Sequence, residues 1–138
     1  METAGEIEAR LRDYLSAHGE AEGLAAAYLF GSVARGTARP DSDVDVGVLF
    51  DHEPPPGLDG LAGHLEAGLE RLLRLPVQLV VLNRAPVDLA KRVLRDGILL
   101  LDRDRSRRIR FEVRTRQEFW DLEPFLRRYR RDPAESRR

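Results

Sequence analysis

The chain has 138 residues, 42% of them apolar, and a formal net charge of −1, which suits one domain with a modest core. It contains no cysteine and only three scattered histidines, which excludes a disulfide framework and argues against a histidine-rich metal site. No apolar run approaches the roughly 20 residues of a membrane span, and residues 1–12 lack the order of a signal peptide. We therefore expect a cytoplasmic protein with no membrane partner.

The charges are distributed unevenly along the chain. Residues 1–83 hold 6 basic and 14 acidic residues, whereas residues 84–138 hold 17 basic and 10 acidic residues. An acidic front half followed by a basic tail is typical of a chain that recruits an anion or an acidic partner. A solvated, arginine-rich helix surface would give the same pattern.

The first elements follow from hydrophobic periodicity. Helical spacing of apolar residues predicts a helix over residues 6–17, closed by His18 and Gly19. The continuous apolar run at residues 24–30 predicts a strand.

A Gly31-Ser32 turn ends this strand. Ser32 is placed to cap a short helix that extends through Arg35, and residues 36–42 form a turn-rich loop. We expect the turn to present backbone N–H groups to an anion.

Residues 43–50 alternate as a strand does. Asp43, Asp45 and Gly47 fall on one face, and the valines between them fall on the other. Two carboxylates at this spacing on a strand project from the same side, where they can share metal ions. An uncompensated charge in an apolar strand is costly, so a divalent cation is the expected compensator.

The second half of the chain alternates between helices and strands. The sequence predicts a stiff linker, a leucine-rich helix, a strand, a helix with proline in its first turn, a short strand and a basic helix that Pro124 kinks or breaks. These elements cover residues 52–57, 58–73, 76–82, 86–95, 98–101 and 102–131. We expect one domain, with a core at about residues 1–101 and a C-terminal helical segment at about residues 102–131.

The stretch from Gly31 to Asp45 resembles the active-site signature of the minimal nucleotidyltransferases, within the DNA polymerase β-like superfamily, and the order of elements follows that family over nearly the whole chain. The resemblance implies an α/β (α+β) fold, in which helices flank a small mixed sheet. It also implies Mg²⁺-dependent transfer of a nucleoside monophosphate, expected to be AMP from ATP, to a hydroxyl.

The resemblance implies roles for individual residues. Asp43 and Asp45 would be the catalytic carboxylates and would bind Mg²⁺, while Gly31 and Ser32 would hold the nucleotide phosphates. From charge and proximity, Arg35 or Arg39 is expected to help neutralise the triphosphate, with a solvated surface arginine as the alternative.

One position departs from the family pattern. The family usually has a third carboxylate on the strand at residues 76–82, where this chain has Gln78. A neutral amide can coordinate weakly through its carbonyl oxygen but cannot act as a base. Asp41 and Asp51 are alternative third ligands, although neither has the expected strand position.

Three functions remain open. Members of the family often act beside a helical toxin of the HEPN class, which implies an antitoxin that attaches AMP to a tyrosine of the toxin. The chain could instead be a nucleotide-binding module, weakened by Gln78, that neutralises its partner by binding. A small-molecule nucleotidyltransferase would need a second subunit, in a homo-oligomer, to complete its substrate pocket. No nucleic-acid-binding module is recognisable in the sequence.

Overall fold

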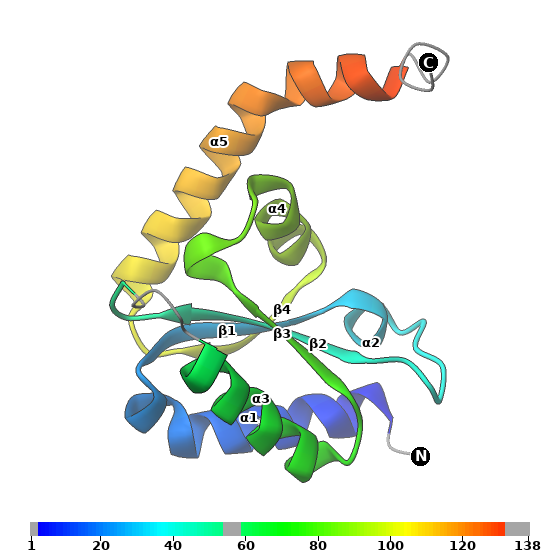
Figure 1. Ribbon diagram of the computed structural model, residues 1–138, viewed down its shortest axis with the longest axis vertical. Coiled ribbons are helices and arrows are strands. Elements are labelled where there is room, and N and C mark those ends of the chain that lie inside the picture. Colours follow the sequence, from blue (N-terminus) through cyan, green and yellow to red (C-terminus); the bar gives the residue numbers. More distant parts are fainter. Residues whose placement is uncertain (1–2, 54–58, 132–138) are drawn as a thin grey trace.

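A computed structural model describes residues 3–53 and 59–131 of the chain (Figure 1). Most of the predicted linker at residues 52–57 lies outside these residues. The elements in chain order are α1 (Ala4–Glu22), β1 (Leu24–Phe30), α2 (Gly31–Arg35), β2 (Val44–Phe50), α3 (Asp59–Leu73), β3 (Val77–Val81), the 3₁₀ turn η1 (Leu82–Arg84), α4 (Val87–Asp96), β4 (Ile98–Asp102) and α5 (Arg105–Arg131). None of the described helices has the combination of length and apolarity that crossing a bilayer requires.

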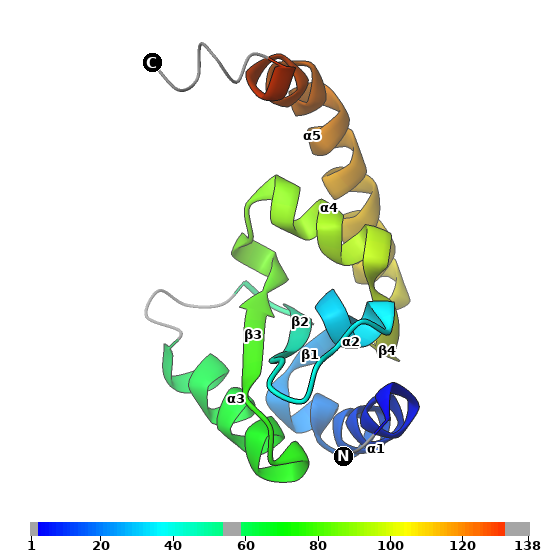
Figure 2. The same cartoon turned by 90° about the vertical axis from the view of Figure 1, so that its right-hand side faces the viewer.

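The strands form one mixed sheet in the order β3-β2-β1-β4. Strand β1 runs antiparallel to both of its neighbours, β2 and β4, while β2 and β3 run parallel. Helices α1 and α3 cover one face of this sheet, and α4 and α5 lie over the other (Figures 1 and 2). The expected small mixed sheet flanked by helices is confirmed.

Strand alternation divides the interior into two cores. Val44, Val46 and Val48 of β2 are fully buried against the side of α1 and α3. Leu49 of the same strand belongs to the other cluster, with Tyr28 and residues of α4 and α5. Because side chains alternate along a strand, Asp45 shares the α4 and α5 side with Leu49.

Helix α5 is held against the sheet by a partly buried group of polar contacts. The hydroxyl of Tyr28 on β1 donates to Glu112 on α5 at 2.7 Å. Arg108 pairs with Asp102 at 3.0 Å and with Glu112 at 3.1 Å. Burial, followed by the hydrogen bond to Glu112, raises the pKa of Tyr28 far above its ordinary value. The start of α5 therefore has a fixed position on β1 and β4.

The end of the first helix differs from the sequence prediction. The prediction that His18 and Gly19 close it is wrong, because α1 continues to Glu22 and is capped by Gly23 at φ 73°. Gly19 instead lies buried inside the helix, where an added Cβ would come within 2.7 Å of Leu101. This glycine permits the close approach of α1 to β4 and does not end the helix.

Two further boundaries differ. Ser32 does not cap α2, since Phe30 takes the N-cap position without a side-chain hydrogen bond and Ser32 is the second helical residue. Strand β2 begins at Val44, one residue after Asp43. Pro124 does not break α5 (Arg105–Arg131), which continues through it; the ribbon changes direction in its later part (orange to red in Figure 1).

Candidate active site

The pairing of β1 with β2 brings Gly31 against Asp45. Phe30 is the Cα partner of Asp45 in the antiparallel ladder, and Gly31 follows it directly. A Cβ added at Gly31 would overlap the carboxylate of Asp45. Gly31 also has a φ of 75°, which side-chain-bearing residues adopt only with strain. Glycine is therefore required here both by the backbone conformation and by the adjacent carboxylate.

The surroundings of Asp45 disfavour the charged form of its carboxylate. Burial raises its pKa, the charge of Asp43 raises it further, and Arg35 partly opposes both effects. Asp43 is exposed and lies one residue before β2, close enough for its charge to repel that of Asp45. A pair of carboxylates that is only partly compensated favours a cation between or beside its oxygens.

Gln78 lies opposite Asp45 on the neighbouring strand. The two are Cα partners in the parallel ladder between β2 and β3, and both line the same pocket. Among the residues that the structure describes, no group of three or more carboxylate, histidine or cysteine side chains is placed to hold a metal ion. The position next to Asp45 thus offers an amide oxygen without a charge.

These residues surround a pocket of about 280 Å³ on the α4 and α5 side of the sheet. It is lined by Phe30, Gly31, Ser32, Arg35, Asp45, Gln78, Val80, Leu89 and Arg92. Helix α2 lies beside one end of the sheet, with α4 near it (Figure 2). The pocket therefore combines a glycine turn, an acidic strand and two arginines.

The structure adds Arg92 to the residues expected from the sequence. Arg92 comes from α4, where it is one helical turn beyond Leu89 and lines the pocket with it. Arg35 forms an ion pair with Asp96, the last residue of α4, at 3.7 Å. The only sequence signal for Arg92 was its spacing of one helical turn from Leu89. This spacing identifies a pocket residue only when α4 is known to cover the sheet face of Asp45.

Two residues considered from the sequence lie elsewhere. Arg39 lines a separate, mostly apolar cavity together with Ile7 and Val33, and its backbone N–H donates to Ser42 Oγ at 2.8 Å. Asp51 lies beyond the opposite end of β2, where it contacts His52 at 2.8 Å and Arg103 at 3.8 Å. The pocket thus brings together Gly31, Ser32, Arg35, Asp45 and Gln78, with Asp43 near its edge.

Comparisons with known proteins agree with this arrangement. The family described as polymerase beta nucleotidyltransferase matches residues 10–106. The protein adenylyltransferase MntA of Thermococcus cleftensis is 41% identical over 98 residues, which cover 71% of this chain and 96% of that protein.

Two solved structures share the fold over most of their length. A toxin–antitoxin crystal structure with AMP-PNP has a TM-score of 0.72 at 25% identity, covering 91% of this chain and 96% of the other. A tri-AMPylated Shewanella oneidensis HEPN toxin in complex with an MNT antitoxin has a TM-score of 0.70 at 21% identity, covering 91% and 97% of the two chains. The family expected from the stretch between Gly31 and Asp45 is confirmed: the chain belongs to the polymerase beta nucleotidyltransferase family and is a nucleotidyltransferase.

Proposed function

We propose that this chain transfers AMP from ATP, in an Mg²⁺-dependent reaction, to a tyrosine hydroxyl of a HEPN toxin and thereby acts as its antitoxin in the cytoplasm. The observation that carries the proposal is the pocket in which Asp45, with Asp43 beside it, faces the Gly31-Ser32 turn. The similar MntA is a protein adenylyltransferase, and one of the similar toxin–antitoxin structures contains AMP-PNP.

The side chains present fit a divalent cation. Asp45 is half-buried beside Asp43, and burial followed by the charge of Asp43 raises the Asp45 pKa, with Arg35 offsetting part of this rise; a bound cation would stabilise the charged carboxylate against both effects. Mg²⁺ binds in many enzymes through one or two carboxylates together with substrate phosphates. Asp43 and Asp45 would hold it here. When bound, Mg²⁺ would neutralise charge on the triphosphate and lower the pKa of the attacking hydroxyl.

The remaining residues of the pocket suit the rest of the nucleotide. The Gly31 turn lets the backbone approach phosphate oxygens, and the Ser32 hydroxyl can donate to one of them. Arg35 and Arg92 can stabilise the charge that gathers on the leaving pyrophosphate. The acceptor hydroxyl releases its proton to water as its oxygen forms a bond to the α-phosphorus, the bond from that phosphorus to the oxygen bridging to the β-phosphorus breaks, and pyrophosphate leaves. The protein contributes mainly position and charge.

The transfer is tested with [α-³²P]ATP, Mg²⁺ and a HEPN protein encoded in the same genome. We expect the label on a tyrosine of the HEPN protein, identified by peptide mass spectrometry, and no label from [γ-³²P]ATP. Asp43→Asn should abolish the label, whereas Asp41→Asn, the same change on the exposed loop two residues earlier, should retain it. Absence of label with the wild-type chain under all Mg²⁺ and Mn²⁺ conditions would contradict the proposal.

One observation favours a second function. Gln78 is neutral at the position opposite Asp45, so a binding module that neutralises its toxin without turnover is the alternative. That function requires a stable complex that forms without ATP and tolerates the double variant Asp43→Asn, Asp45→Asn. If the toxin regains its activity in a complex with this double variant, binding alone does not neutralise it, and this alternative function is eliminated.

A further inference from the structure

An apolar stripe runs along the outer face of α5. In the described part of the chain, the large apolar side chains that are exposed all lie on this helix, and three of them are Ile109 at 40%, Val113 at 46% and Trp120 at 73% exposure. Their spacing of four and seven residues places them on one face of a helix with 3.6 residues per turn. Phe111 and Thr115, each 4% exposed, occupy the opposite, packed face.

The stripe is held in a fixed orientation. Glu112 and Arg108 tie the inner face of α5 to Tyr28 and Asp102 of the sheet. Farther along α5, the Lys91 ammonium of α4 lies 5.7 Å from the Phe119 ring centre. Beyond α4, the helix extends away from the body of the molecule (Figures 1 and 2). A partner would therefore meet a preorganised surface, which lowers the entropic cost of binding.

The stripe has the dimensions and flanks of a helix-docking surface. From Ile109 to Trp120 the rise is about 17 Å, which is three helical turns. Exposed arginines border it, Arg105 and Arg116 on one side and Arg110 on the other. Arg116 reaches Glu112 at 3.9 Å, but an exposed pair at this distance contributes little, so its charge stays available to a partner.

We propose that the Ile109–Val113–Trp120 stripe binds an amphipathic helix of the toxin that carries acidic residues beside its apolar face. This inference rests on the proposed function, because it assigns the surface for the same partner. Charge complementarity selects an acidic occupant: α5 contains ten arginines and four acidic residues, so a second copy docked through its own α5 would oppose like charges. Trp120 is exposed and has Arg116 one helical turn before it, and tryptophan and arginine are both enriched at interface hot spots.

The surface is also placed to serve the active site. Helix α4 lines the nucleotide pocket with Leu89 and Arg92 and contacts α5 through Lys91 and Phe119. Both helices lie on the sheet face that carries Asp45 (Figure 1). A toxin docked on α5 would therefore lie on the side of the molecule where its acceptor hydroxyl is needed, which raises the local concentration of that hydroxyl.

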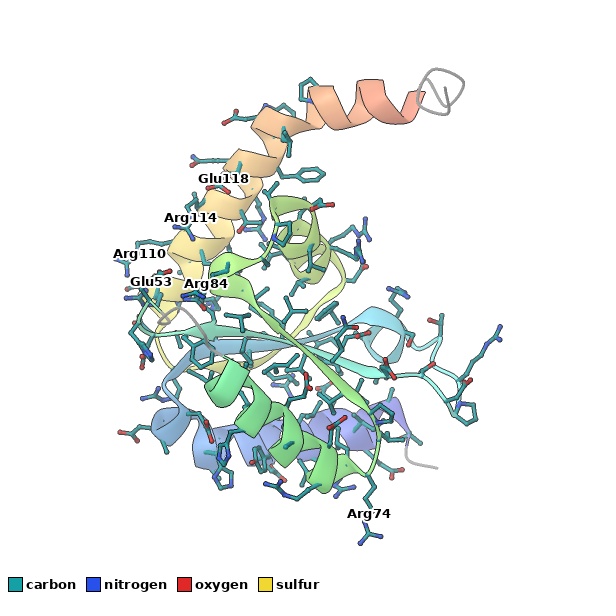
Figure 3. All side chains as sticks on the ribbon, in the orientation of Figure 1. Glu53, Arg74, Arg84, Arg110, Arg114 and Glu118 are labelled. Carbon is teal, nitrogen blue, oxygen red and sulfur yellow. The ribbon has the colours of Figure 1, made fainter. Side chains whose placement is uncertain are left out.

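The test measures the affinity of the chain for the HEPN protein of the same genome by calorimetry. We expect Trp120→Ala and Val113→Glu each to weaken binding by about 30-fold or more. Arg110→Glu should weaken it about tenfold and make the affinity less sensitive to salt. The matched control is Arg74→Glu, at the opposite end of the molecule (Figure 3), which should bind the toxin normally.

Binding of AMP-PNP with Mg²⁺ is measured on the same variants and should equal that of the wild type, which shows that they are folded. Wild-type affinity of all three α5 variants for the toxin would overturn the proposal. The proposal would also be overturned if the α5 variants lost a homodimer, or lost RNA binding, while their affinity for the toxin stayed intact. Weak toxin binding by the α5 variants, together with no adenylyl transfer by the wild type, would support the docking surface and contradict the proposed transfer.

Discussion

The carboxylate of Asp45 occupies the space that a Cβ atom at Gly31 would fill. The two residues come from different segments, and the pairing of Phe30 with Asp45 brings them together. The glycine turn and the acidic strand thus form one unit, because neither can hold its position if residue 31 carries a side chain.

Gly31→Ala should damage both stability and nucleotide binding. The methyl group would overlap Asp45, and the φ of 75° is strained for alanine, so we expect a loss of about 2 kcal/mol or more in unfolding free energy. Displacement of Asp45 should also lower the affinity for AMP-PNP with Mg²⁺ at least tenfold. Chemical denaturation and calorimetry measure the two effects.

Gly36→Ala is the matched control. Gly36 has a φ of 74°, but nothing lies within 4 Å of an added Cβ. Gly36→Ala should lower the free energy of unfolding by about 1 kcal/mol, the cost of the left-handed backbone conformation alone. Nucleotide binding should be unchanged. Equal effects of the two substitutions on nucleotide binding would show that contact with Asp45 is irrelevant.

Asp45→Asn should abolish transfer and yet stabilise the ligand-free protein. The pKa of Asp45 is raised above its ordinary value of 3.8 in the folded state, so stability falls as the pH rises through the interval above that value and stays reduced at neutral pH. The variant removes this cost. At pH 7 its melting temperature without nucleotide should exceed that of the wild type by a few degrees.

The difference in melting temperature should shrink as the pH falls and vanish below the ordinary pKa value of 3.8, where Asp45 is protonated in both the folded and the unfolded chain. Saturating ATP with Mg²⁺ should reverse the order at pH 7, because only the wild type gains from binding. If Asp45→Asn is less stable than the wild type at pH 7 without nucleotide, the charged carboxylate of Asp45 does not destabilise the folded chain, which would contradict this account.

Gln78→Glu should strengthen the metal site. It places a third carboxylate in register with Asp45, so the Mg²⁺ concentration for half-maximal transfer should fall by about tenfold. Gln78→Met, which keeps the length without an oxygen, should raise that concentration or leave it unchanged. A lower transfer rate in Gln78→Glu at every Mg²⁺ concentration would show that the neutral amide is needed for activity.

Tyr28→Phe should flatten the alkaline loss of stability. Since the folded-state pKa of Tyr28 lies above its ordinary value of 10.0, the folded chain binds its proton more tightly and loses stability as the pH rises beyond about 10. Thermal melts between pH 8 and pH 11 should show a smaller decline in Tyr28→Phe than in the wild type. Tyr14→Phe, which lies outside the contact with Glu112, should show the same decline as the wild type. If Tyr28→Phe declines as steeply as the wild type, Tyr28 is not the cause of the alkaline loss of stability.

The elements with strong patterns could be predicted from the sequence. The buried run of β1 (Leu24–Phe30) and the alternation of β2 reflect local periodicity; β1 covers the expected residues, and β2 differs from the expected strand only in starting at Val44. Alternation along β2 predicts the sheet face on which Asp45 lies, whereas the contact of Asp45 with Gly31 depends on the pairing of β1 with β2. Gln78 was placed beside the site only through the family resemblance, and the register of β3 with β2 agrees with that placement.

Features that depend on packing could not be predicted in this way. Gly19 reads as a helix end in the sequence, but contact with Leu101 explains its presence within α1. Arg92 reached the pocket because α4 crosses the face of Asp45, a tertiary relationship without a local signal. Arg39 is close to the turn in sequence, yet the loop carries it to another cavity. Proximity along the chain therefore identified Arg35 as a pocket residue but not Arg92, and it wrongly included Arg39.

The most direct test of the site is a crystal structure of the chain with AMP-PNP and Mn²⁺, which scatters anomalously. We expect an anomalous peak bound by Asp43 and Asp45, with the triphosphate against Gly31 and Ser32. A well-occupied nucleotide whose phosphates and metal lie away from these four residues would contradict the assignment of the active site.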